Sequence, residues 1–296
     1  MSLACIRYRS VSTLIGIAHM STRLSLIVFL LISVLLFMAA ASGGLELGTQ
    51  DAPADSASGA KTILVFSKTA GFRHDSIAEG ITCFQELGRE LGFDVVATED
   101  SSVFTAKRLA AVAIVVFLNT TGDVLDRTQE AAFESYIRGG GAWFGVHAAA
   151  DTEYDWPFYG RLVGAYFKSH PEIQSARINI EIKDHPSTRM LPGLWRRTDE
   201  WYTYRLSPRK GVTVLASLDE ESFSGGGMNG DHPIAWCHEF EGGRALYTGG
   251  GHTKASYEEP KFRAHLKGAL EWLAKKSDRA VENVKDESQL DSVDPG

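Results

Sequence analysis

Apolar runs alternate with amphipathic segments through the first half of the central part of the chain. Four short runs are expected to form strands: Ile63–Phe66, Asp94–Thr98, Val112–Leu118 and Ala142–Val146. Three of them are apolar on both faces, which is typical of strands buried in a parallel sheet. The segments Asp75–Leu91 and Thr128–Arg138 are amphipathic and are followed by glycine, so they are expected to be helices. Repeated strand–helix–strand units of this size predict a doubly wound parallel sheet.

The pattern changes in the second half of the domain, where apolar and polar residues alternate. Further strands are expected at Ala176–Ile182, Val212–Leu218, Ile234–Phe240 and Arg244–Thr248. Glu241–Gly243 separates the last two and indicates a hairpin, so these strands are expected to extend the sheet as antiparallel additions. Pro260–Ala274 is an amphipathic helix that closes the domain. The predicted fold class is therefore α/β, with a mostly parallel sheet and added antiparallel strands.

The N-terminal segment is expected to be a targeting signal rather than part of the fold. Leu24–Ala41 is almost entirely apolar, follows Arg23 and ends in small residues, which is typical of a secretory signal. The run is also long enough to span a bilayer, and Met20 could be the true start. We therefore expect a signal peptide or an N-terminal membrane anchor over residues 1–42, with cleavage near Ala41 favoured. In either form the domain is expected to lie outside the cytoplasm. It would be periplasmic or secreted after cleavage, or anchored to the membrane by residues 24–41.

The remaining organisation follows from composition. Residues 43–60 are rich in Gly, Ala, Ser and Asp and are expected to be a linker, residues 61–276 a single domain, and the polar residues 277–296 a disordered tail. The net charge of -7 and the lack of a basic stripe exclude nucleic acid as a favoured partner, and membrane contact is expected only through the N-terminal segment. Cys83 and Cys237 lie in apolar contexts and are expected to be buried free thiols.

Three histidines lie in the loops that follow predicted strands. His74 comes after the first strand, His147 after the fourth and His252 after the last, each close to glycine. In an open parallel sheet, ligands bind outside the carboxyl ends of the strands, so these three imidazoles are expected to share one site. The other histidines of the second half lack this placement and are expected to be structural; they include His170, His185, His232 and His265.

The strand-to-helix turn at His147 has a particular chemical meaning. Gly145–Ala149 carries small residues around its apex, and at such an elbow α/β hydrolases and class I glutamine amidotransferases place a Ser or Cys nucleophile. Here the apex is histidine, and an imidazole cannot replace the thiolate of an amidotransferase. Glutaminase activity is therefore not expected.

A second cluster combines carboxylates with aromatic rings. Glu200 is a candidate general base, Trp201 and Tyr202 are candidate platforms for a sugar ring, and Asp199 is a candidate substrate-binding residue. An ordinary charged surface segment explains the same residues equally well. Arg73 and Asn119 also follow predicted strands and are candidates for binding hydroxyls or a developing oxyanion; both join the substrate-binding set.

Several of these motifs together resemble the ThuA-like (trehalose utilisation) family. The matching pieces, in order, are Gly71–His74, Gly139–His147, Asp199–Tyr202 and Gly243–His252. The resemblance covers nearly all of residues 61–276 and implies a class I glutamine amidotransferase-like, flavodoxin-related fold. It also implies a role in disaccharide catabolism beside oxidoreductases that form 3-keto sugars. The site residues it implies are His74, His147, Glu200 and His252. The chain departs from the family's usual sequence at Gly249–Gly251, which is more flexible than the Ser/Leu-containing form.

Three functions remain open from the sequence. The first is a hydrolase or lyase that acts on a disaccharide or keto-glycoside, with His147 as general base or acid and Glu200 assisting proton transfer. The second adds a divalent metal, zinc or similar, bound by His74, His147, Glu200 and His252. The third is a non-catalytic, extracytoplasmic carbohydrate-binding or accessory protein that works with a sugar oxidoreductase. No dinucleotide fingerprint follows the first strand, so the chain is not expected to transfer hydride itself.

Overall fold

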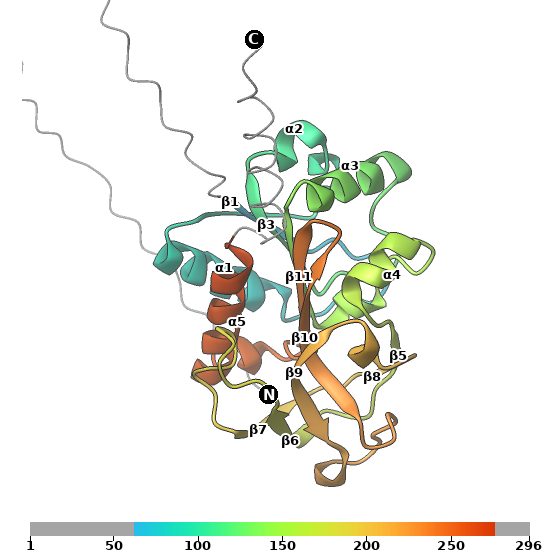
Figure 1. The fold of residues 1–296 in the computed structure, drawn as a ribbon, viewed down its shortest axis with the longest axis vertical. Coiled ribbons are helices and arrows are strands. Elements are labelled where there is room, and N and C mark those ends of the chain that lie inside the picture. Colours follow the sequence, from blue (N-terminus) through green and yellow to red (C-terminus); the bar gives the residue numbers. More distant parts are fainter. Residues whose placement is uncertain (1–61, 276–296) are drawn as a thin grey trace, which may run out of the picture. The chain divides into compact units, whose positions relative to one another are not determined.

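The computed structural model describes residues 62–275, which form a nine-stranded sheet with helices on both sides (Figure 1). Five neighbouring strands run parallel, in the order β2-β1-β3-β4-β11. They are β1 Thr62–Phe66, β2 Asp94–Thr98, β3 Val112–Leu118, β4 Ala142–Val146 and β11 Gly243–Thr248. The four strands predicted for the first half are thus present. In β1, β3 and β4 the side chains are apolar on both faces and require the cover that helices give a parallel sheet.

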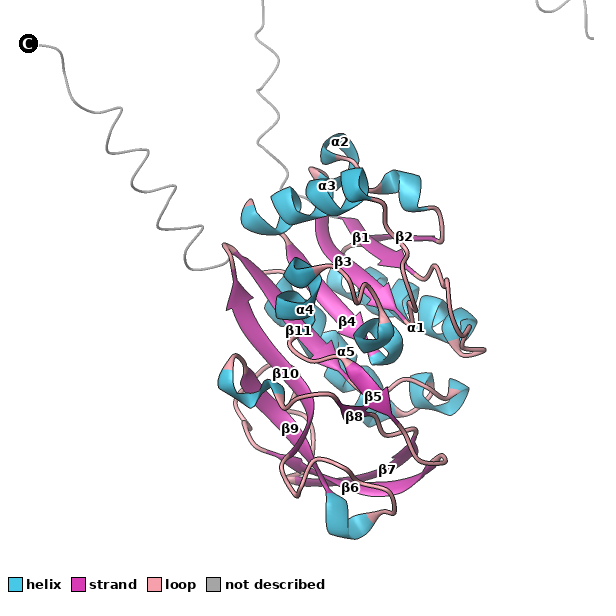
Figure 2. Ribbon diagram, turned by 90° about the vertical axis from the view of Figure 1, so that its right-hand side faces the viewer, coloured by secondary structure: helices cyan, strands magenta, loops and turns pink. Residues whose placement is uncertain are grey.

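The rest of the sheet is antiparallel and continues from β11 in the order β10-β9-β6-β7. These strands are β10 His232–Phe240, β9 Thr213–Asp219, β6 Gln174–Ile180 and β7 Leu194–Asp199. Figure 2 shows β6 and β7 at the far end of the sheet from β1 and β2. The four pairings that lead from β11 to β7 are all antiparallel, so β7 runs in the same direction as β11 and β4. The carboxyl end of β7 therefore lies at the same edge of the sheet. The predicted α/β class, with antiparallel strands added in the second half, is confirmed.

Helices cover the two faces of the sheet. Helices α1 (Ile77–Leu91) and α5 (Pro260–Leu273) contact each other on one face, while α3 (Arg127–Arg138) and α4 (Pro157–Val163) lie on the other (Figure 1). Helix α1 ends at Gly92, whose φ of 78° is left-handed and favours glycine. Because both faces are covered, the side chains of β1, β3 and β4 form the buried core.

Some elements were not predicted because their sequences lack a periodic hydrophobic pattern. The short helix α2 (Ala106–Leu109), helix α4, strand β7 and the two-stranded sheet of β5 (Phe167–Ser169) and β8 (Thr203–Tyr204) are all absent from the sequence prediction. In β7 the buried positions carry Trp195, Arg197 and Asp199, so alternation of burial is not matched by alternation of hydropathy. The two strands β5 and β8 are too short to give a periodic signal.

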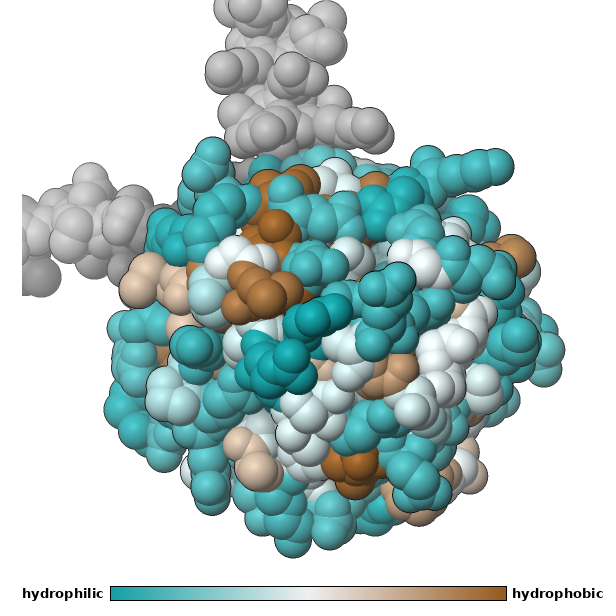
Figure 3. Space-filling view, turned by 90° about the horizontal axis from the view of Figure 1, so that it is seen from below, coloured by the Kyte–Doolittle hydropathy of each residue, from teal (hydrophilic) through white to brown (hydrophobic). Residues whose placement is uncertain are grey.

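The predicted signal peptide or anchor (1–42), linker (43–60) and tail (277–296) lie outside the described residues. Within residues 62–275, none of the helices has the length and apolar character needed to cross a membrane. Cys83 and Cys237 are buried and form no disulfide, as predicted, and burial raises the pKa of their thiols to about 11 and about 12. Figure 3 shows one face of the molecule, on which polar side chains predominate and hydrophobic ones lie in small separate groups.

Candidate metal centre

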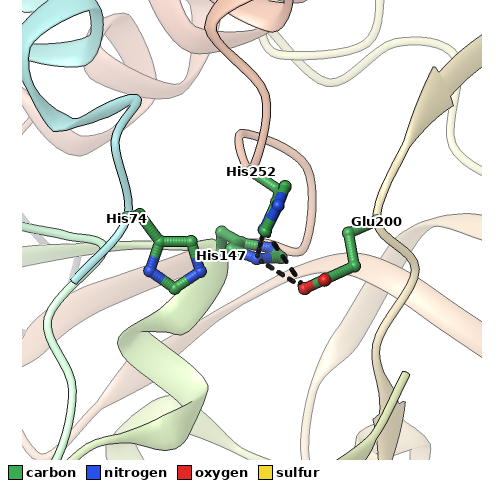
Figure 4. A group of neighbouring side chains, drawn as sticks. All are labelled: His74, His147, Glu200 and His252. Carbon is green, nitrogen blue, oxygen red and sulfur yellow. Dashed lines mark hydrogen bonds and ion pairs between the residues drawn. The ribbon is translucent and has the colours of Figure 1, made fainter. Parts of the chain in front are cut away.

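Four side chains from distant parts of the chain converge at one edge of the sheet (Figure 4). His74 follows β1, His147 follows β4, Glu200 follows β7 and His252 follows β11. These four strands share one direction, so their carboxyl ends meet at the same edge. One nitrogen or carboxylate oxygen from each residue lies within 4.8 Å of the others. The structure therefore brings together the four residues that the sequence placed in one site.

Three of the four donor atoms form a nearly equilateral triangle. His147 Nε2 lies 3.2 Å from His252 Nδ1 and 3.3 Å from Glu200 Oε2, and His252 Nδ1 lies 3.2 Å from the same oxygen. An ion placed about 2.1 Å from all three atoms would make ligand–ion–ligand angles of about 100°, close to the tetrahedral arrangement that zinc prefers. The triangle thus has the size that a first-row divalent ion requires.

The backbone at His147 is held in an uncommon conformation. His147 has a φ of 49°, which fits the tight strand-to-helix elbow expected from the sequence. Its side chain is fully buried.

The hydrogen bond of His147 determines which ring nitrogen faces the centre. Its Nδ1 lies 2.9 Å from the carbonyl oxygen of Gly249. A carbonyl can only accept, so Nδ1 carries the proton and Nε2 presents a lone pair to the centre. A metal-binding imidazole is usually oriented in this way, by a hydrogen bond from the nitrogen that does not bind the metal.

The glycine run before His252 is required by close packing. A Cβ atom at Gly250 would lie 2.4 Å from Arg197 Nη1, and Gly251 has a φ of 111°. Asp199 then fixes the loop on both sides of His252, since its carboxylate accepts from Gly251 N at 2.8 Å and from Thr253 N at 3.2 Å. The departure from the usual family sequence therefore still places His252 at the site.

His74 completes the cluster in a form that suits a ligand. Burial, together with the charges of His147 and His252, lowers the pKa of His74 to about 3, so its imidazole is neutral at neutral pH. Its Nδ1 is buried and has no hydrogen-bond partner among the described residues. An unpartnered polar atom in the interior is costly, and a bound ion or a small shift towards one would relieve that cost.

Glu200 and His252 shift each other's pKa. Burial alone would raise the pKa of Glu200, but its close interactions with the imidazoles of His147 and His252 outweigh burial and hold the pKa well below its usual range. For His252, burial by itself would lower the pKa. The hydrogen bond and the charge of Glu200 outweigh burial, so the pKa of His252 is raised overall. The site therefore favours a carboxylate anion beside positive charge, and a divalent cation satisfies the same preference.

Three imidazoles and one carboxylate make an N₃O donor set that fits zinc or a similar divalent ion. The family model of ThuA, described as trehalose utilisation, matches residues 62–273. The chain belongs to the ThuA family.

Solved structures of ThuA-like proteins share the fold. One from Bacteroides uniformis ATCC 8492 is 26% identical, with a TM-score of 0.65 over 77% of this chain and 97% of that chain. Another, from Parabacteroides merdae ATCC 43184, is 21% identical, with a TM-score of 0.60 over 72% of this chain and 90% of that chain. No curated protein matches this chain.

The aromatic residues of this ThuA domain do not lie where the sequence predicted. Trp201 is fully buried and its Nε1 donates to Gln174 O at 2.9 Å. Tyr202 is 3% exposed and its ring lies between those of His147 and Phe167, at centroid distances of 4.1 and 4.3 Å. Neither ring has a free face, so the prediction that they stack on a sugar is wrong.

Two of the predicted substrate-binding polar residues are structural. Asp199 is fully buried and all its hydrogen bonds go to the protein, including Ser256 Oγ at 3.0 Å. Asn119 is also fully buried, and its amide donates to Ser76 Oγ and Gly251 O, both at 3.2 Å. Both residues therefore hold the site loops in place, and neither is accessible to a substrate. Arg73 differs, because it is half exposed and forms an ion pair with Glu99 at 2.6 Å.

One residue at the site was missed. The sequence placed His170 among the structural histidines, yet its Nδ1 lies 3.0 Å from Glu200 Oε1. His170 follows β5, and β5 pairs with β8 just after Glu200–Tyr202, which brings the two segments together. No signal in the sequence predicts this pairing, because the two strands are very short.

Proposed function

We propose that this ThuA domain is a metal-dependent, carbohydrate-active enzyme, a hydrolase or lyase that acts on a disaccharide or keto-glycoside. The observation that carries the proposal is the triangle of His147 Nε2, His252 Nδ1 and Glu200 Oε2, with sides of 3.2–3.3 Å. Membership of the trehalose utilisation family supports carbohydrate as the substrate class. The N-terminal segment supports a location outside the cytoplasm.

Metal binding and direct acid–base catalysis compete for the same atoms. If His147 were the general base, Nε2 would have to receive the substrate proton, and Glu200 Oε2 would share it. Both atoms are instead directed at His252 Nδ1, in the space that an ion would fill. We therefore favour the metal over the metal-free mechanism, since a carboxylate oxygen and imidazole nitrogens gathered at these distances are stabilised together by a cation.

The proposed chemistry needs few protein groups. A divalent ion supplies electrostatic stabilisation of a carbonyl or hydroxyl oxygen of the sugar. In a keto-glycoside, the carbon beside the ketone is acidic. Loss of its proton and departure of the glycosidic oxygen, which takes up a proton, together cleave the bond as an elimination. Hydrolysis would consume one water instead. An oxidoreductase that forms a keto sugar is the class of enzyme expected to supply such a substrate.

An aromatic platform for the sugar is available at the rim of the site. The ring of Phe72 is 68% exposed and lies 4.9 Å, edge to face, from the ring of His74. The loop is fixed there by Thr121 Oγ1, which donates to Phe72 O at 2.8 Å. Phe72 can offer one face to the apolar side of a sugar ring, a role that Trp201 and Tyr202 cannot fill. The neighbouring Arg73 remains a candidate for binding hydroxyls.

A non-catalytic binding protein is the less favoured function. A carbohydrate-binding site needs exposed aromatic and polar groups, but it has no use for three imidazoles held around a buried carboxylate. Of the four site residues, His74, His147 and Glu200 are buried. Such a desolvated cluster carries a cost in stability that catalysis or metal binding explains.

Removal of the ion tests the proposal. The purified chain is expected to contain about one equivalent of a divalent metal, by elemental analysis, because the cluster offers one complete ligand set. A chelator is expected to remove it and to abolish turnover in a screen of native and 3-keto mono- and disaccharides, and re-added metal to restore it. Turnover that survives complete removal of metal would leave the metal-free mechanism, and sugar binding without any turnover would favour the accessory protein.

The substitution Phe72→Ala tests the sugar platform. With a substrate from the screen, we expect KM to rise about 2–13-fold, since a stacked aromatic contact contributes about 0.5–1.5 kcal/mol. Metal content should not change, because the ring is not a ligand. Leu206→Ala is the matched control, as Leu206 is also strongly exposed but is not part of the site. An unchanged KM in Phe72→Ala would remove this residue from the substrate site.

A further inference from the structure

The two carboxylate oxygens of Glu200 contact different partners. Oε2 faces His147 Nε2 and His252 Nδ1, whereas Oε1 faces His170 Nδ1 at 3.0 Å. Within residues 62–275, His170 Nδ1 is the one side-chain nitrogen found in contact with Oε1. The side chain of His170 is 43% exposed, while that of Glu200 is 8% exposed, so the contact lies at the boundary between the buried cluster and solvent.

The proton of His170 can be assigned from its surroundings. Its Nδ1 also lies 3.0 Å from the carbonyl oxygen of Pro171. A carboxylate and a carbonyl both accept hydrogen bonds, so Nδ1 must carry a proton. This nitrogen is hydrogen-bonded to Pro171 O and lies within ion-pair distance of Glu200 Oε1.

We propose that His170 is a positioning residue of the metal centre, which fixes Glu200 as a ligand through one oxygen. With Oε1 held beside the Nδ1–H group of His170, Oε2 alone would be directed at the ion. Hydrogen-bonded partners of this kind set the orientation of metal ligands, and their loss typically lowers metal affinity about 10–100-fold. The proposal rests on the proposed function, because it requires that the cluster binds a metal.

The strand pairing explains why His170 can act in this way. β5 pairs with β8 through Phe167↔Tyr204 and Ser169↔Thr203, so the residue after β5 lies beside the residues that precede β8. The ring of Phe167 packs against Tyr202 at 4.3 Å, which ties the same two segments together by their side chains. His170 is thus held by the backbone, although its ring is exposed, and its removal is expected to leave the fold intact.

The test compares zinc affinity, by competition with a chromophoric chelator, in the wild type, His170→Ala and His170→Asn. Ser169→Ala is the control, because Ser169 is an exposed neighbour whose side chain is not in the site. We expect His170→Ala to bind zinc about 10–100-fold more weakly. His170→Asn should recover most of the affinity, since its amide nitrogen can replace Nδ1 as a donor. Thermal unfolding of the metal-free proteins should be the same for all.

The outcomes separate the two proposals. If the wild type binds no zinc or other divalent ion, the proposed metal centre itself fails. If the wild type binds zinc and His170→Ala binds it equally well, the positioning role of His170 is overturned while the metal centre stands. If alanine and asparagine weaken binding to the same extent, the hydrogen bond is not the cause, and the inference is also overturned.

Discussion

Replacing His147 by asparagine is expected to weaken metal binding by at least about 100-fold and to remove turnover, because a direct ligand contributes more than the outer hydrogen-bonded partners of a site. Asparagine is chosen because it tolerates a positive φ, and His147 has a φ of 49°. The change therefore removes Nε2 from the centre without forcing the backbone out of the elbow. Affinity is measured by competition with a chelator, and turnover with the substrate found in the screen.

The control for this variant removes an imidazole elsewhere. His185→Asn is suitable because His185 contacts Trp272, at a ring distance of 5.2 Å, rather than any of the four site residues. It should bind metal as the wild type does. Equal affinity in the wild type and His147→Asn would show that His147 is not a ligand, and the four-residue centre would have to be abandoned.

Replacing Asp199 by alanine is expected to lower the free energy of unfolding by about 3–5 kcal/mol, which is the cost of breaking a buried ion pair. Asp199 is fully buried, and its Oδ2 lies 2.9 Å from Arg197 Nη1. The same carboxylate accepts from Gly251 N, Thr253 N and Ser256 Oγ. Without it, several buried donors lose their partner and the loop that carries His252 is released. Chemical denaturation of the metal-free protein measures the change.

Asp199→Asn is the matched variant, since it keeps the shape of the side chain and removes the charge. We expect a smaller loss of stability than for alanine, because one amide oxygen can still accept. Metal affinity should fall in both variants, since Gly251 and Thr253 flank His252. A loss below about 1 kcal/mol in Asp199→Ala would fall in the range of an exposed pair and would contradict a structural role for this residue.

The sequence was most informative where hydrophobicity alone determines structure. Strands β3 and β4 have the bounds that were predicted, because runs such as Val112–Leu118 can be satisfied only in the middle of a covered sheet. Strand β7 could not be found in this way. Its inward positions carry Arg197 and Asp199, which form an ion pair with each other inside the protein, so the polar residues that suggest a surface segment are in fact buried.

The site was predictable in part for the same reason. His74, His147 and His252 each follow a parallel strand, and the rule that carboxyl ends share one edge was enough to group them. Glu200 follows β7, which the hydrophobic pattern did not reveal, and it was grouped with them through the family motif. His170 depends on the short pairing of β5 with β8, which is fixed by tertiary contacts and leaves no periodic trace.

The aromatic residues show a different limit of sequence reasoning. Trp201 and Tyr202 were candidate platforms for a sugar ring, a role that requires exposed rings, but both are buried. An adjacent charge does not indicate which way a neighbouring side chain points when the chain leaves a strand. Phe72, by contrast, lies in a polar loop and is exposed beside His74. Only the positions of the surrounding loops distinguish these cases.

A crystal structure of the chain grown with zinc, with anomalous diffraction recorded at the zinc edge, tests the central claim most directly. We predict a single anomalous peak about 2.1 Å from His147 Nε2, His252 Nδ1 and Glu200 Oε2, with the ring of His74 turned towards it. Absence of a peak at these atoms, with His147 Nε2 hydrogen-bonded to Glu200 in its place, would contradict the metal centre.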